Sequence, residues 1–163
     1  DDGEVTFEDT TVGGVIPRGF VAAVEKGVRG ALSEGPQGHP VVGVAITLRD
    51  GQTHAKDSSD MAFHRAGAEA VKAALAQAGT RVLEPVMEIA IHVPSVHVGD
   101  VVGDLNRRHG RVSSIDDLGG RAEVVGLAPL AQLSGYTTAL RSLTQGRASS
   151  DMRFTGYEEV QAA

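Results

Sequence analysis

A histidine, an aspartate and two serines lie within six residues of one another in the first half of the chain: His54, Asp57, Ser58 and Ser59. Such a set could supply a serine nucleophile, a base and an orienting carboxylate. Hydrolase serines of one large class stand in a strained Gly-x-Ser-x-Gly turn, and the chain contains no such sequence. Serine and aspartate are also preferred residues at the start of a helix. We therefore expect Asp57, Ser58 or Ser59 to cap the helix that follows, and we expect no catalytic residue.

Two further kinds of site have no support in the sequence. The phosphate-binding pattern GxxxxGK[ST] does not occur, so this chain by itself should not hydrolyse GTP. The six histidines form no HExxH motif or other ligand spacing, and there is no cysteine. We therefore expect neither a metal site nor a bound cofactor in this chain.

The charge of the chain is acidic and evenly distributed. The net charge is −6; residues 1–82 carry 8 basic and 11 acidic side chains, and residues 83–163 carry 7 and 10. Proteins that bind nucleic acid mainly through phosphates are usually basic, so any RNA contact should be local, and DNA binding is not expected. Because no run approaches the roughly 20 apolar residues of a membrane span and the acidic start lacks signal-peptide features, we expect a cytoplasmic protein without a membrane partner.

Two helices and two extended segments are predicted in the first half. Apolar side chains recur at spacings of three and four after Pro17 and again after Ser59, as in amphipathic helices. Between them, apolar residues alternate with smaller or polar ones, as in a half-buried strand. In chain order we expect an extended segment before Gly13, a helix over about 20–32, a strand over 42–48, a polar loop over 52–59 and a helix over 61–78.

The second half is predicted to contain four strands and two helices. Their order is strand, helix, strand, strand, helix, strand, over 86–93, 98–108, 111–117, 122–128, 131–143 and 146–154. Leu118-Gly119-Gly120 is a natural hairpin connection between the two middle strands. This βαββαβ order is typical of a ferredoxin-like domain, an antiparallel sheet with two helices on one face. The fold class is therefore α+β, with domains expected at 1–82 and 83–163.

Several uncommon strings occur along the chain in a fixed order. They are VGGVIPR (12–18), VEKGVR (24–29), DSSDMAF (57–63), LEPVM (83–87), GDVVGDLNRRHG (99–110) and GYTTALRSLTQGRA (135–148). Together they resemble domains IV and V of elongation factor G from about Val12 to Tyr157. The resemblance implies a domain like domain 2 of ribosomal protein S5, followed by a ferredoxin-like domain.

The resemblance also implies a function for the polar loop. Domain IV of this family is an arm whose tip enters the decoding region of the small ribosomal subunit and holds the tRNA–mRNA complex during translocation. One tip loop has the form GxxHxxDSS, which Gly51, His54, Asp57, Ser58 and Ser59 match. By this resemblance His54, Lys56, Asp57 and Ser58 are the expected RNA contacts, because imidazole and ammonium groups can bind phosphate or 2′-hydroxyl oxygens.

The chain also departs from the family pattern. Thr53 and Ala55 stand where relatives carry an aromatic and an acidic residue, and we expect a second, glycine-rich tip loop to lie upstream of Asp1. Three functions therefore remain open: translocation of tRNA and mRNA, ribosome protection or recycling by a divergent paralogue, and small-molecule binding by a free-standing ferredoxin-like protein.

Domain V of the family contacts RNA of the large subunit, and five arginines are candidates for this role. They are Arg107, Arg108, Arg111, Arg141 and Arg147, whose guanidinium groups suit bidentate phosphate contact. The alternative is that these arginines form structural ion pairs, with Asp100 and Asp104 as partners. The resemblance further implies a monomer that binds rRNA and the tRNA–mRNA complex, with GTP and Mg²⁺ held by an upstream GTPase domain of a longer parent protein.

Overall fold

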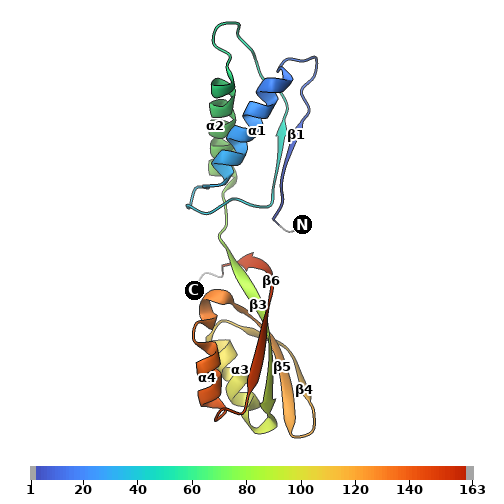
Figure 1. Ribbon diagram of the computed structural model, residues 1–163, viewed down its shortest axis with the longest axis vertical. Helices are drawn as coiled ribbons and strands as arrows, with labels where there is room; N and C mark the ends of the chain where they lie inside the picture. Colours follow the sequence, from blue (N-terminus) through green and yellow to red (C-terminus); the bar gives the residue numbers. More distant parts are fainter. Residues whose placement is uncertain (1–2, 161–163) are drawn as a thin grey trace. The chain divides into compact units, whose positions relative to one another are not determined.

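The computed structural model describes residues 3–160 (Figure 1). Contacts between residues divide the chain between Thr80 and Arg81 into two compact units, which are described separately. None of the helices in the described part of the chain is long and apolar enough to cross a bilayer.

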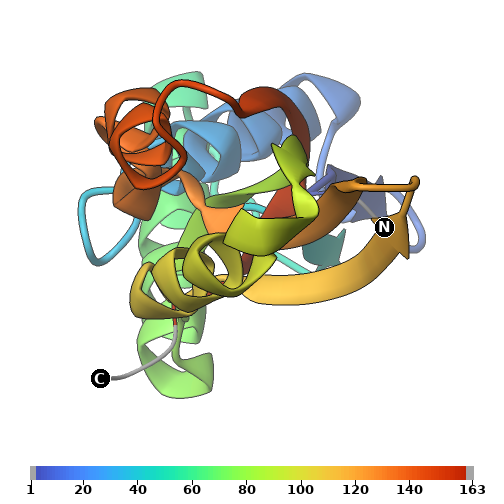
Figure 2. The ribbon, with the colours of Figure 1, turned by 90° about the horizontal axis from the view of Figure 1, so that it is seen from below.

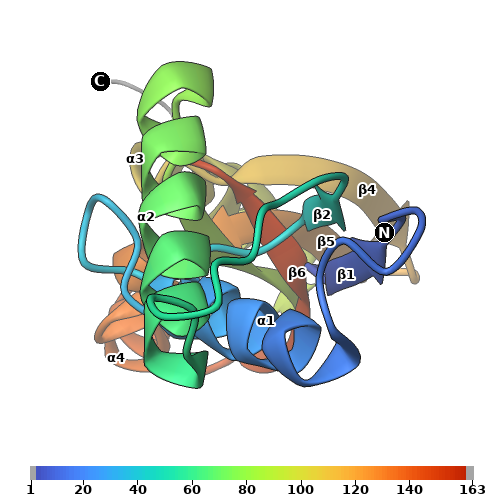
Figure 3. The same cartoon turned by 90° about the horizontal axis from the view of Figure 1, so that it is seen from above.

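The first unit consists of two parallel strands and two helices (Figure 3). In chain order these are β1 (Val5–Asp9), α1 (Arg18–Leu32), β2 (Val44–Leu48) and α2 (Asp60–Ala78). β1 and β2 pair in register from Val5 opposite Val44 to Asp9 opposite Leu48. Apolar side chains of both helices form the core, with strand residues packed against them; Val24, Val28, Leu32, Val71 and Leu75 are buried. The helical periodicity of the sequence therefore predicts the buried face of α1. In α2 the prediction is wrong, because the alanine-rich stripe expected from Met61 to Ala74 is exposed and the helix buries Gly67, Val71 and Leu75 instead.

Two glycines let α1 and α2 approach backbone to backbone. A Cβ atom built on Gly27 would lie 1.9 Å from the carbonyl oxygen of His64, and one built on Gly67 would lie 2.7 Å from the carbonyl oxygen of Val24. No other residue type fits at such a contact without moving a helix. The reciprocal glycines thus fix α1 against the first turns of α2, directly after the polar loop.

Local residues set where these elements begin. Pro17 is the N-cap of α1, and Phe20 N donates to its carbonyl oxygen (2.9 Å). Ser59 is the N-cap of α2, and its side chain accepts from Ala62 N at 3.1 Å. Helix capping by one of the predicted residues is thus confirmed. The strand predicted over 42–48 begins only at Val44, because Gly43 has a left-handed φ of 67°, which breaks the extended backbone.

The second unit is a four-stranded antiparallel sheet with its helices on one face (Figure 1). In Figure 2, which views the chain from below, α3 and α4 lie towards the left and the hairpin formed by β4 and β5 extends to the right. The strand order is β4-β5-β3-β6, which agrees with the predicted βαββαβ chain order. The elements are β3 (Leu83–Pro94), the 3-10 helix η1 (Ser95–His97), α3 (Val98–Arg107), β4 (Arg111–Asp117), β5 (Arg121–Pro129), the 3-10 helix η2 (Leu130–Leu133), α4 (Tyr136–Leu143) and β6 (Ser149–Glu159).

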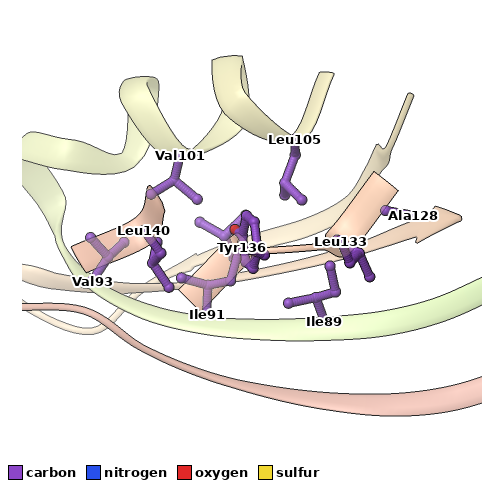
Figure 4. Close-up of a cluster of buried hydrophobic side chains, with 10 residues drawn as sticks. Ile89, Ile91, Val93, Val101, Leu105, Ala128, Leu133, Tyr136 and Leu140 are labelled. Carbon is purple, nitrogen blue, oxygen red and sulfur yellow. The ribbon is translucent and has the colours of Figure 1, made fainter. Parts of the chain in front are cut away.

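The core of this unit lies between the helices and the central strands (Figure 4). Alternate residues of β3, namely Ile89, Ile91 and Val93, are fully buried, as the period-two pattern predicts. They meet buried side chains from α3, η2 and α4: Val101, Leu105, Leu133, Tyr136 and Leu140. Apolar alternation in β3 and helical spacing in α3 therefore account for most of this core.

Several predicted boundaries of this unit differ from the structure; β3 begins three residues earlier than predicted, and β6 begins at Ser149 and not at Gly146. The helix expected over 131–143 is divided into η2 and α4, because Gly135 has a left-handed φ of 68° between them. Because the apolar spacing continues across Gly135, the sequence pattern did not indicate this break. The last strand ends at Glu159, five residues beyond the prediction. Its register with β3 shifts between Val86 and Met87, which interrupts the alternation of its side chains, but its pairing with β3 continues past this point.

Candidate nucleic-acid interface

The loop between β2 and α2, residues 49–59, is anchored at both ends. At its start, Thr10 N donates to the carbonyl oxygen of Leu48 at 2.9 Å and so ties the ends of both strands together. Gly51 packs against the buried Ile16, since a Cβ on Gly51 would lie 2.5 Å from Ile16 Cδ1. At its end, the Ser59 cap joins the loop to α2. The loop before α1, which contains the VGGVIPR string, therefore supports the polar loop.

Hydrogen bonds within the loop close a turn around His54. The carbonyl oxygen of His54 accepts from Ser58 N at 3.0 Å and from Asp57 N at 3.3 Å. His54 N in turn donates to Ser58 Oγ at 2.7 Å. The Ser58 hydroxyl is thus engaged with the backbone and not with the imidazole ring. These hydrogen bonds stabilise the loop just before α2. They do not include the contact between a serine nucleophile and a histidine base that a hydrolase needs.

The His54 ring and Lys56 extend from this turn into solvent. His54 Nδ1 lies 3.1 Å from Asp57 Oδ2, and the two side chains are 69% and 82% exposed. Lys56 is exposed and forms no ion pair with any residue from 3 to 160. The structure therefore brings together all four residues predicted for this loop, with His54 and Lys56 available to a partner.

Arg108 is held within its own unit. Its guanidinium donates to Asp104 Oδ2 at 2.8 Å and to the carbonyl oxygen of Gln132 at 2.7 Å, and it lies 5.2 Å from the ring centre of Tyr136. Its side chain is only 20% exposed, and that of Asp104 is 12% exposed. These contacts join the end of α3 to η2 and α4, which is a structural role.

Arg107 and Arg111 are more accessible but also paired. Arg107 lies 3.3 Å from Asp104 and remains 69% exposed. Arg111 donates two hydrogen bonds to the Glu158 carboxylate, at 2.8 and 2.5 Å. These hydrogen bonds lower the pKa of Glu158 and raise the pKa of Arg111. The bidentate geometry expected for phosphate is thus occupied by a carboxylate of the same unit.

Arg141 lies in α4, and Arg147 lies in the turn between α4 and β6. Arg147 contacts His97 Nε2 and Gln145 Oε1, each at 3.0 Å, while Arg141 is exposed without an ion pair among the described residues. Because β3 and β6 are antiparallel, Arg147 precedes β6 at the end of the sheet opposite to the start of β4, where Arg111 lies. The five arginines therefore do not form one continuous patch.

Several partners of these side chains could not be predicted from the sequence. Glu158 is 47 residues from Arg111, and Gln132 is 24 residues from Arg108. Only the strand order and the position of η2 bring them together.

No group of three or more histidine or acidic side chains within residues 3–160 is arranged to hold a metal ion.

Comparisons with known proteins agree with this architecture. Residues 1–79 match the family model "Elongation factor G, domain IV", and residues 81–163 match "Elongation factor G C-terminus". The chain is 51% identical over 162 residues to Elongation factor G 2 of Streptomyces coelicolor, covering 99% of this chain and 24% of that protein. It superposes with a TM-score of 0.87 on a crystal structure from Thermus thermophilus, with 36% identity over 98% of this chain and 24% of that one.

The two family models meet at the boundary between the two compact units, and together they span almost all of the chain. The chain spans about a quarter of the length of the relatives that it matches. The order of the recognisable strings, the βαββαβ unit and these matches lead to one conclusion. This chain belongs to the elongation factor G family and comprises its domain IV followed by its C-terminal domain.

Proposed function

We propose that the chain is the ribosome-contacting arm of a translational GTPase and promotes movement of the tRNA–mRNA complex. The observation that carries the proposal is the loop over 49–59. It is braced by its own backbone and by Ile16, and it presents His54 and Lys56 to solvent in a chain that is otherwise acidic. A preorganised loop that presents an imidazole and an ammonium group suits RNA recognition by shape and by the 2′-hydroxyl.

The proposed mechanism is steric and electrostatic and involves no covalent step. The arm would occupy the site that the tRNA leaves and would bind the ribosome better after movement than before it. Such a difference in affinity shifts the population of the two states, and a tenfold shift requires about 1.4 kcal/mol. In this proposal GTP hydrolysis, with its Mg²⁺, belongs to another domain of the parent protein.

The C-terminal domain would supply a second ribosomal contact. Arg141 and Arg107 are the strongest candidates, because Arg141 is exposed without an ion pair among the described residues and Arg107 is 69% exposed. Arg111 and Arg147 would have to exchange partners, and Arg108 would act only by supporting the end of α3.

A second candidate function is ribosome protection or recycling without translocation. Thr53 and Ala55 favour it, because both are exposed beside His54 and neither offers the aromatic or acidic group expected there. The two functions differ in whether they depend on His54. Translocation should depend on His54, whereas ribosome binding alone should depend on several contacts spread over both domains.

The test is His54→Ala in the full-length parent protein, with His39→Ala as the matched control. His39 is an exposed histidine in the loop between α1 and β2, at the opposite end of this unit from the loop over 49–59. We expect His54→Ala to slow single-turnover translocation at least several-fold while co-sedimentation with ribosomes persists, and His39→Ala to change neither. An unchanged translocation rate in His54→Ala would refute the tip role.

A further inference from the structure

We propose that the face of the C-terminal sheet opposite α3 and α4 is a docking surface for a basic protein segment with at least two lysine or arginine side chains. The residues that carry the proposal are Ala90, Asp116, Glu123, Val125 and Asp151, and we call this surface the acidic face. It lies in the second unit, apart from the loop over 49–59, and it is a binding site beyond the proposed function.

The strand registers place these five side chains on one side of the sheet. Residues directly opposite each other in antiparallel strands point to the same side. Asp116 of β4 is opposite Glu123 of β5. Ala90 of β3 is opposite both Val125 of β5 and Asp151 of β6. Glu123 and Val125 are two positions apart in β5, so the two groups share a side. The buried alternate residues of β3 and β5 point to the other side, on which α3 and α4 pack (Figure 1).

The centre of the acidic face is apolar. Ala90 and Val125 lie on the two central strands of the sheet and are half-buried. Within residues 81–160 both helices pack on the opposite side, so these two side chains keep contact with solvent. A surface of this kind can receive the aliphatic stem of a lysine or arginine while the charged end of that side chain reaches a carboxylate beside it.

The carboxylates around this centre have no arginine or lysine partner among residues 3–160. Asp116 and Asp151 are exposed and form no ion pair with any of these residues. The Glu123 carboxylate lies 3.6 Å from His92 Nε2, and this contact joins two charges only if the ring is protonated. The acidic face therefore carries negative charge that its own unit does not neutralise.

The arginines on the same side of the sheet are engaged elsewhere. Arg153 lies 2.7 Å from Glu88, and Arg111 donates two hydrogen bonds to Glu158. Arg121 stands at the end of β5 and donates to the carbonyl oxygen of Arg147, at 3.4 Å. Two of the three arginines are thus paired with other carboxylates, and the third is within ion-pair distance of no carboxylate among residues 3–160.

The pair of Asp116 and Glu123 is unfavourable for the chain alone. Like charges directly opposite each other in neighbouring strands repel, which lowers stability. An ammonium or guanidinium group from a partner would contact both carboxylates and replace this repulsion by attraction. The charge of the acidic face is therefore complementary to a cationic occupant.

The spacing of the carboxylates sets the size of the occupant. Asp116 and Asp151 lie on the outer strands β4 and β6, three strand spacings apart, or about 14 Å across the sheet. In an extended segment, residues four positions apart are separated by roughly 13 Å and point to the same side. The acidic face therefore fits two basic residues at positions i and i+4 of an extended segment, with an apolar residue between them at i+2 above Ala90 and Val125.

Charge also argues against three other occupants. RNA phosphates would be repelled by the same carboxylates. A second copy of the chain carries a net charge of −6, so two copies repel each other at long range. No group of three or more histidine or acidic side chains in the described part of the chain is arranged to hold a metal ion.

The first test is an NMR titration of the 163-residue chain with the synthetic peptide Gly-Lys-Thr-Val-Thr-Lys-Gly. We expect amide shifts that centre on Ala90 and Val125. Replacing one lysine of the peptide by glutamine removes one exposed ion pair and should weaken binding about threefold. Shifts centred elsewhere, or none at millimolar peptide, would overturn the proposal.

The second test changes the carboxylates. Asp116→Asn and Asp151→Asn should each weaken peptide binding about threefold, and the double variant about tenfold. Asp100→Asn is the matched control, because Asp100 lies in α3 on the other side of the sheet, and it should leave binding unchanged. Asp116→Asn should also keep or raise the urea midpoint, since it relieves the repulsion from Glu123. Equal binding by all variants, or a lower midpoint in Asp116→Asn, would contradict the proposal.

The remaining occupants are outcomes of the same measurements. If polyuridine or Mg²⁺ moves the same amides at lower concentration than the peptide, the acidic face belongs to RNA or to a metal ion and the proposal fails. Sedimentation equilibrium that shows dimers in wild type but not in Asp116→Asn would assign the face to a second copy. None of these experiments contains ribosomes, so their results are independent of the proposed function.

Discussion

Arg111 and Glu158 join the two outer strands of the C-terminal sheet, β4 and β6, through two hydrogen bonds of 2.8 and 2.5 Å. Strands β5 and β3 lie between these strands in the sheet, and the two residues are 47 positions apart in the sequence. The pair therefore links the edges of the sheet at the end where β4 begins. An arginine that would suit RNA phosphate serves in this chain as an internal connection.

Glu158→Gln should lower the free energy of unfolding at pH 7 by about 0.5–1 kcal/mol, because both side chains are about half exposed and exposed pairs contribute little. Arg111 lowers the pKa of Glu158, so this contribution is present above the ordinary glutamate pKa and is lost as the pH falls through the lowered value. Urea unfolding of both proteins at pH 7 and pH 3 measures it, and the difference should be smaller at pH 3 than at pH 7.

Glu84→Gln is the matched control for this pair. Glu84 lies opposite Glu158 in the β3–β6 register and forms no ion pair among the described residues. We expect its replacement to be neutral or slightly stabilising, because it removes repulsion between two carboxylates. Equal losses in both variants would mean that the Arg111 contact contributes nothing specific.

Tyr136→Phe should stabilise the protein. The ring is 1% exposed, and the hydroxyl has no hydrogen-bond partner among residues 3–160. Burial, with a smaller contribution from Asp104, raises the pKa of Tyr136 to about 12. An unsatisfied buried hydroxyl costs about 1–3 kcal/mol, so its removal should raise the urea midpoint. Tyr136→Ala should instead destabilise by about 3–5 kcal/mol. Destabilisation by Phe would indicate a bound water at the hydroxyl.

Gly27→Ala should destabilise the first unit although alanine favours helices. The new Cβ would lie 1.9 Å from the carbonyl oxygen of His64 and would force α1 and α2 apart. Overpacking of this kind costs about 1–3 kcal/mol beyond the roughly 1 kcal/mol gained in helix propensity. Gly30→Ala is the control, because it lies in the same helix with nothing within 4 Å and should stabilise. Similar midpoints for the two variants would exclude the close approach.

Ser58 and Ser59 should respond differently to alanine although they are neighbours. Ser59→Ala removes the cap bond to Ala62 N and should cost about 1 kcal/mol in thermal or urea unfolding. Ser58→Ala removes the acceptor of His54 N, so the amide of His54 should exchange with solvent faster while global stability changes little. Hydrogen exchange read residue by residue separates the two effects. Unchanged exchange at His54 in Ser58→Ala would refute the bracing role.

The sequence alone determined the elements and the family. The strand predicted over 86–93 contains the buried Ile89, Ile91 and Val93, and the spacing after Ser59 predicted α2, with Asp57, Ser58 or Ser59 as its cap. Periodicity of this kind depends on neighbours within one or two turns, so it can be read without knowledge of the fold. The ordered strings from Val12 to Ala148 identified the family for the same reason, because they are local patterns.

Only the tertiary structure decided which side chains are available to a partner. It placed Arg111 on Glu158 and Arg108 on Asp104 and Gln132, and it left His54 and Lys56 exposed on a loop supported by Ile16. These pairings depend on strand order, register and helix approach, which bring together residues distant in the sequence. Charge and residue type do not encode such distances, so the sequence could name the candidate arginines but could not distinguish structural from accessible ones.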